Sequence, residues 1–193
     1  MADISDSTRM NINLQGLSDK LEELVLHVAV MSEKDARFGS TKLNKLIWTA
    51  DFKAFCQTGR TITGATYQKE KYGPVPKAMP IVLERLETEG RLSLKPTRFG
   101  FWTGARPVAA AGARPDLTAF SQQELATVDK VIAESFGKTG TDMSTESHKL
   151  LAYKVAKIGE TIPFSAWLIS ARKPTENQKR HGHELAFAHA RQS

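Results

Sequence analysis

The sequence predicts an α+β fold that is mostly α-helical, with a helical core and a small β-hairpin or winged-helix-like element. Apolar residues recur at helical spacing, three or four residues apart, in several segments of the chain. Between these segments lie short runs of strand-forming residues bounded by Gly and Pro. At 193 residues the chain is long enough for one domain with a sizeable core.

The first half of the chain is predicted to hold three helices, one short strand and a hairpin. We expect Ser40 or Thr41 to cap the second helix and Gly59 to end it. Pro74 and Pro76 restrict the backbone that follows the strand. In chain order, the predicted elements are a helix from Leu17 to before Phe38, a helix ending at Gly59, a strand near 66–71, a helix over 79–89 with Ile81, Val82, Leu83 and Leu86 as its apolar side, and a hairpin of 92–94 with 98–102.

The second half is predicted to be helical after a linker. Ala, Gly and Pro dominate residues 105–115, a composition typical of a loop. Ser121 and Glu124 have the spacing of a capping box for a fourth helix. We expect this helix to end in the segment from Gly137 to Gly140. The later predictions are a fifth helix starting at Ser144 with Leu150, Leu151, Val155 and Ile158 inside, a short segment at 164–169 and an exposed polar helix over 173–191.

We expect three parts: a flexible N-terminal arm over 1–16, a single domain over 17–170 and a polar C-terminal helix or tail over 171–193. No apolar run approaches the roughly 20 residues that span a bilayer, which predicts no membrane partner. The single cysteine, Cys56, cannot form an internal disulfide, so we expect a reducing, cytoplasmic setting and a buried or half-buried thiol.

The positive charge is concentrated in the middle of the chain. The net charge is +6, but residues 37–115 alone hold 14 basic and 5 acidic side chains. Such an excess predicts contact with phosphates or with an acidic protein, and it is equally compatible with a solvated basic face.

The sequence places no catalytic, cofactor or metal site. His148 follows Ser147 directly, but adjacent side chains on a helix do not face each other, which disfavours a nucleophile and base pair. His181, His183 and His189 stand in a polar terminal segment without the cysteine support of a closed zinc site. We therefore expect that the protein is not an enzyme.

Four segments resemble the Panacea domain of the SocA-like antitoxin family. Lys42–Asp51 is similar to that family's Lys-Leu-x-Lys-Leu start, and Gly59–Thr63 looks like its Gly-x-Pro/Thr-Ile/Leu segment. Lys71–Val75 resembles its most diagnostic motif, an aromatic or basic residue followed by Gly-Pro-Val. Ser144–His148 resembles its late Ser/Thr-His motif, with Tyr153 standing where a Trp is common.

This resemblance covers roughly Leu17 to Leu168 and implies a bacterial or phage antitoxin, which neutralises a cognate toxin protein by direct contact and has no catalytic residues. The motif positions carried over are Lys42, Leu46, Trp48, Gly73, Pro74, Val75, Ser147 and His148. Gly73 and Pro74 are expected to shape a turn first. The candidate partner-binding residues are Lys42, Lys45, Trp48, Lys69, Lys71, Tyr72, Gly73, Pro74, Val75 and His148.

Two other functions stay open at this point. The basic middle segment and the winged-helix-like order of elements favour a DNA-binding autoregulator that contacts its operator. An enzyme using His148 is the least favoured hypothesis, because no base, nucleophile and orienting group are placed by spacing. An exposed hairpin face also allows a homodimer.

Overall fold

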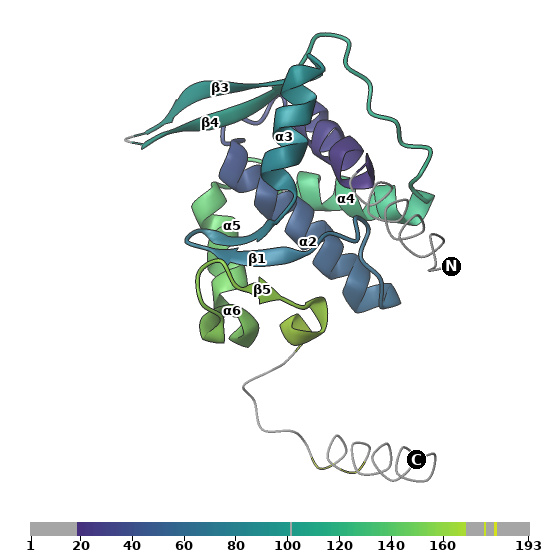
Figure 1. Cartoon of the computed structure of the whole chain (residues 1–193), viewed down its shortest axis with the longest axis vertical. Coiled ribbons are helices and arrows are strands. Elements are labelled where there is room, and N and C mark those ends of the chain that lie inside the picture. Colours follow the sequence, from purple (N-terminus) through teal and green to yellow (C-terminus); the bar gives the residue numbers. More distant parts are fainter. Residues whose placement is uncertain (1–18, 101, 169–175, 177–179, 181–193) are drawn as a thin grey trace, which may run out of the picture.

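The computed structural model describes residues 19–100 and 102–168, together with Glu176 and Arg180. Within this part, helices pack around two small antiparallel sheets (Figure 1), which confirms the predicted mostly helical α+β class. The predicted arm at 1–16 lies outside the described residues, as does the predicted tail apart from Glu176 and Arg180, so His181, His183 and His189 are not placed. No helix of the described part is long and apolar enough to cross a membrane.

A first helix over 19–31 precedes the other helices and strands, most of which are labelled in Figure 1. In chain order these are α2 (Ser40–Thr58), β1 (Tyr67–Glu70), β2 (Gly73–Pro76), α3 (Met79–Thr88), β3 (Leu92–Phe99), β4 (Trp102–Ala109), α4 (Gln122–Ser135), α5 (Gly140–Lys149), α6 (Leu151–Val155), β5 (Thr161–Ile162) and the 3-10 helix η1 (Phe164–Leu168).

Helix α2 runs through the middle of the molecule and contributes to both apolar clusters (Figure 1). Its residues Leu43, Leu46 and Ile47 pack with the first helix, α3 and α4 in the larger cluster. Trp48 of α2 joins Tyr67 and residues of α6 and β5 in the smaller cluster. The helix therefore has little surface left for solvent, and some of its charged residues are buried as well.

Asp51 is the most enclosed of these charged residues, with a relative exposure of 0%. Its Oδ1 accepts the backbone N–H groups of Ile62 at 2.8 Å and Thr63 at 2.9 Å. Its Oδ2 accepts the Tyr67 hydroxyl at 2.8 Å and the Thr63 hydroxyl. Burial raises the pKa of the Asp51 carboxyl, and these four hydrogen bonds oppose that rise. One side chain thus fixes the loop after α2 and the start of β1.

The two sheets are each simple. Strands β2, β1 and β5 form the first in that order, so β2 and β5 are its edges. Strands β3 and β4 form a separate hairpin that projects from the body (Figure 1). The Arg106 guanidinium of β4 donates to the carbonyl oxygens of Glu33, Asp35 and Phe38, which ties the hairpin to the segment that precedes α2.

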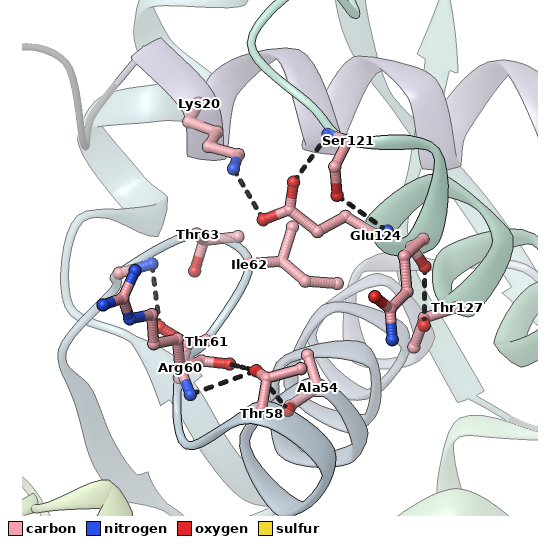
Figure 2. Close-up of polar contacts among 12 residues, drawn as sticks. Lys20, Ala54, Thr58, Arg60, Thr61, Ile62, Thr63, Ser121, Glu124 and Thr127 are labelled. Atoms are coloured by element: carbon pink, nitrogen blue, oxygen red, sulfur yellow. Dashed lines mark hydrogen bonds and ion pairs between the residues drawn. The ribbon is translucent and has the colours of Figure 1, made fainter.

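Local capping chemistry sets two helix ends, as predicted. Ser121 and Glu124 form the capping box of α4, and Lys20 of the first helix donates to Glu124 Oε1 at 2.8 Å (Figure 2). Helix α2 ends at Gly59, which has φ 73 and donates its N–H to the Phe55 carbonyl. Thr58 closes the same end by donating its hydroxyl to the Ala54 carbonyl (Figure 2).

Two predicted helix starts are wrong. Neither Ser40 nor Thr41 caps α2, whose N-cap is Gly39 without a side-chain hydrogen bond. Ser40 instead donates its hydroxyl to the Ala105 carbonyl of β4. Helix α5 begins at Gly140 rather than at Ser144, because Thr139 and Asp142 form the capping box.

The hairpin is longer than predicted, and the linker correspondingly shorter. Phe99 pairs with Trp102, so the turn falls within the segment that was predicted as a strand. The second strand extends to Ala109, into the predicted linker.

The Gly-Pro-Val-Pro segment is strand β2 rather than a turn. Four side chains predicted as internal are exposed in the structure: Ile81, Val155, Ile158 and Cys56.

We predict that Asp51→Ala lowers the free energy of unfolding by at least about 3 kcal/mol, because it leaves buried donors without an acceptor. Asp51→Asn should cost clearly less, since its amide oxygen still accepts both backbone N–H groups. Urea denaturation followed by circular dichroism measures both. Losses below about 1 kcal/mol for both variants would show that this carboxylate does not organise the loop.

Candidate partner-binding surface

The candidate residues gather around the β1–β2 hairpin. Strand β2 contacts both α2 and α5, and the last turn of α5 leads directly into α6. Lys42, Lys45 and Trp48 come from α2, His148 comes from α5, and the remaining candidates lie on the hairpin itself. The fold therefore brings the separate motifs into one region, but it buries some of their side chains and exposes others.

Lys42 is internal, with a relative exposure of 2%. Its ammonium group donates to Asp35 Oδ2 at 2.5 Å, to the Ser135 carbonyl at 2.6 Å and to the Lys138 carbonyl at 2.7 Å. These bonds use all three hydrogens and join the start of α2 to the end of α4. Lys42 thus holds the fold together and has no donor left for a partner.

Lys45 is also internal, with a relative exposure of 1%. Its Nζ donates to the Pro74 carbonyl at 3.0 Å. Burial lowers the pKa of Lys45 to about 7. A lysine of this kind connects α2 to β2 and does not present a charge to solvent.

Gly73 makes room for Lys45. A Cβ at this position would lie 2.6 Å from Lys45 Nζ and 2.8 Å from Ser147 Oγ, and the backbone φ is +107. Both the close approach and the backbone conformation require glycine. Pro74 beside it is buried, whereas Val75 is half-buried and packs on the larger apolar cluster.

Trp48 is 5% exposed and stacks on Phe52, with ring centroids 5.2 Å apart and an interplanar angle of 8°. It therefore belongs to the core and does not form part of an exposed surface. Trp48 contributes to any interface through the position of α2 and not through its own surface.

Lys69 and His148 are half-buried around Tyr153. Lys69 donates to the Ala156 carbonyl at 3.0 Å, and its Nζ lies 4.5 Å from the centroid of the Tyr153 ring. The His148 ring stacks on the same tyrosine at 4.4 Å. The Tyr153 hydroxyl donates to the Glu70 carbonyl at 2.6 Å. Lys69 therefore stabilises the contact between the hairpin and α6.

Lys71 and Tyr72 are the exposed candidates. They form the turn between β1 and β2, and Tyr72 has a relative exposure of 51%. The Lys71 ammonium lies 5.3 Å from the centroid of the Tyr72 ring. Ser144 of α5 donates to the Tyr72 carbonyl at 2.7 Å and fixes the backbone of the turn. This turn presents a cation and an aromatic ring to solvent on a held backbone.

A groove of about 570 Å³ opens beside the turn. It lies between the N-terminal ends of α2 and α5 and the middle of β4, and Tyr72 and His148 are among its lining residues. The side chains that line it are mostly hydroxyl-bearing or basic. Lys42 holds the start of α2 and Ser144 holds the Tyr72 backbone, so these two residues fix the position of two walls of the groove.

The arrangement does not supply a nucleophile and base. Ser147 is fully buried beside Lys45, and its hydroxyl donates to the Ser144 carbonyl. Burial, together with the charges of Lys45 and Lys69, lowers the pKa of His148. Among the described residues, no group of His, Cys, Asp and Glu has the arrangement of a metal site.

A family model described as Antitoxin SocA-like, Panacea domain, matches residues 43–152, more than half of the chain. The chain belongs to this family. The matched range runs from the first turn of α2 to α6, so it includes the β1–β2 hairpin, the β3–β4 hairpin and α5. No curated protein and no solved structure matches the chain.

Sequence reasoning missed two residues that organise this region, Asp35 and Asp51, and one exposed residue that lines the groove, Arg37. Asp51 stands one turn after Ile47 on the apolar side of α2, and a charge on such a face signals a buried hydrogen-bond acceptor. Asp35 and Arg37 lie in the short segment before α2, where spacing gives no indication of their surroundings.

We predict that Gly73→Ala destabilises the protein more than an alanine at another left-handed glycine. Gly112 has φ +77 with nothing within 4 Å of an added Cβ, so Gly112→Ala reports backbone strain alone, about 1–2 kcal/mol. Gly73→Ala adds the collision with Lys45 and Ser147. Urea denaturation compares the two, and equal losses would contradict the close packing at Gly73.

We predict that stability rises with pH between about 7 and 10 because of Lys45. Its pKa is about 7 in the folded protein and 10.5 as an ordinary lysine. In this window the unfolded chain therefore binds one proton more than the folded chain. The equilibrium constant for folding consequently rises by up to about tenfold per pH unit. Chemical denaturation at several pH values should show a shallower slope for Lys45→Met, and identical slopes would rule out the depressed pKa.

Proposed function

We propose that this protein is the antitoxin of a toxin–antitoxin system and neutralises a cognate toxin protein by direct binding. The family match over residues 43–152 carries this proposal. The structure adds support, because the family's motif residues mostly serve the fold and the accessible remainder is a turn with the character of an interface.

The turn formed by Lys71 and Tyr72 is the proposed contact. Tyrosine is enriched among the residues that dominate binding energy, because its ring buries a large area at low entropic cost. The backbone of this turn is held by Ser144 and Tyr153, so little further ordering is needed on binding. Neutralisation on this account is non-enzymatic and takes place in the cytoplasm, with residues 17–170 acting as one domain.

We predict that co-expression with the product of the neighbouring gene restores growth and yields a co-purifying complex. Lys71→Glu combined with Tyr72→Ala should weaken the complex by about 2 kcal/mol or more, because the pair loses an aromatic anchor and reverses a charge. Growth assays and titration calorimetry provide the two readouts.

The matched control is Lys130→Glu, which reverses an exposed lysine on α4, 70% exposed at its side chain. It should leave affinity within about threefold of the original protein. A toxin that binds the double variant as tightly as the original would remove the turn from the interface, and a neighbouring product that is neither toxic nor bound would remove the antitoxin proposal.

Operator DNA is a second candidate partner. The projecting β3–β4 hairpin exposes Lys95 and Arg98, as a wing that contacts a DNA backbone would. Binding of this kind weakens linearly with the logarithm of salt concentration. A fluorescence titration against the upstream region of the gene at several salt concentrations, with Arg98→Glu as the variant, tests it.

A further inference from the structure

The groove beside the turn has a one-sided electrostatic character. Arg37, Lys42 and His148 are among the residues that line it, and none of the described lining residues is Asp or Glu. Since Lys42 has all three hydrogens bonded inside the protein, the accessible positive charge is that of Arg37. A hollow with a cation and no carboxylate suits an acidic ligand.

Arg37 is available for such a ligand. Its side chain is exposed, and it forms no ion pair with any residue that the structure describes. Asp142 is a carboxylate whose pKa is affected by the charge of Arg37. The pKa of Asp142 is lowered chiefly by the hydrogen bonds from Thr139 and to a smaller degree by Arg37. Asp142 accepts the Thr139 N–H and hydroxyl at the start of α5, and it is not among the described residues that line the groove.

The floor of the groove adds further donors. The start of α2 carries neither a side-chain cap nor an acidic residue in its first turn, so its positive end is uncompensated. Thr41, Thr141 and Thr145 also line the groove. Gly140 lets the two helix starts meet, because a Cβ there would lie 2.9 Å from Thr41 Cγ2.

A separate observation concerns His148, at the inner side of the groove. It lines the groove, and its Nε2 is buried without a hydrogen-bond partner among the described residues. The ring cannot swing away freely, because it stacks on Tyr153. A buried ring nitrogen left unpaired is costly, so the inner side of the groove contains an unsatisfied polar atom.

We propose that this groove receives an acidic side chain of the cognate toxin. The carboxylate of that side chain pairs with Arg37, and Tyr72 packs against the neighbouring residues of the toxin. This inference rests on the proposed antitoxin function and names the groove and the chemistry of the toxin segment that enters it. The guanidinium of Arg37 suits a carboxylate, with which it forms two parallel hydrogen bonds.

A protein side chain fits the groove better than a nucleic-acid backbone does. A nucleic-acid strand places a phosphate at every nucleotide, and proteins that follow it line up several cations. This groove offers one accessible arginine and a bordering tyrosine, which is the pairing typical of the centre of a protein interface.

The test compares Arg37→Glu with Arg114→Glu in the full chain bound to the purified toxin. Arg114 is an exposed arginine on the loop after β4, so both variants change the net charge equally. We expect Arg37→Glu to raise the Kd at least about 30-fold and Arg114→Glu to change it less than threefold. Replacing single Asp and Glu residues of the toxin by Arg should identify one that restores binding to Arg37→Glu.

A photo-crosslinking residue supplies a readout that does not depend on charge. Placed at Thr145, which is exposed and lines the groove, it should crosslink to the toxin, and at the exposed Ala133 of α4 it should not. The groove assignment alone would be overturned if the Arg37→Glu variant binds and neutralises the toxin normally and the probe at Thr145 does not crosslink to the toxin.

The remaining outcomes are also decisive. If the original protein neither binds the toxin nor restores growth, the antitoxin proposal fails and the groove assignment fails with it. If Arg37→Glu weakens binding to operator DNA and leaves the toxin complex unchanged, the groove is a nucleic-acid contact and the assignment is wrong.

Discussion

Helix α2 buries three charged side chains, and the rest of the structure depends on satisfying them. An ion inside a protein costs several kcal/mol unless hydrogen bonds replace its water. Lys42 obtains these bonds from Asp35 and from the end of α4, Lys45 from β2, and Asp51 from the loop at 62–63 and from Tyr67. Each charge therefore specifies which segment of the chain lies against which turn of the helix.

This constraint accounts for the composition of the Gly-Pro-Val segment. Gly73 leaves space for the Lys45 ammonium, and Pro74 provides the carbonyl that accepts its hydrogen bond. Proline is tolerated there because β2 is an edge of its sheet, where a missing N–H need not break a ladder. The Gly-Pro-Val motif is thus a packing solution for a buried lysine.

Sequence reasoning succeeded where local chemistry decides the structure. Gly59 ends α2 and the Ser121 capping box starts α4, because both signals act within one helical turn. It failed where distant contacts decide. Strand β4 contains Gly104, Ala105 and Pro107, which are weak strand formers, and it extends because it pairs along the whole of β3.

The motif segments lie together in the fold, but the depth of their side chains was not predicted. Lysine is so commonly exposed that Lys42 and Lys45 were expected at the surface. Their position beside Leu43 and Leu46 on a helix buried on several sides was the signal that the prediction did not use. The start of α5 was misplaced because Thr139 and Ser144 are both adequate capping residues, and only the fold distinguishes them.

The buried network also determines how the surface can bind. Lys42 fixes the start of α2, which forms one wall of the groove, and Ser144 fixes the backbone of Tyr72 on another. A surface held in this way loses little conformational freedom on binding, so more of its contact energy contributes to affinity. Because the motif residues are mostly occupied inside the domain, the proposed antitoxin function assigns toxin recognition to side chains outside the buried frame, such as Arg37 and Lys71. Substitution of such exposed side chains can change the binding surface without changing the interactions that hold the domain together.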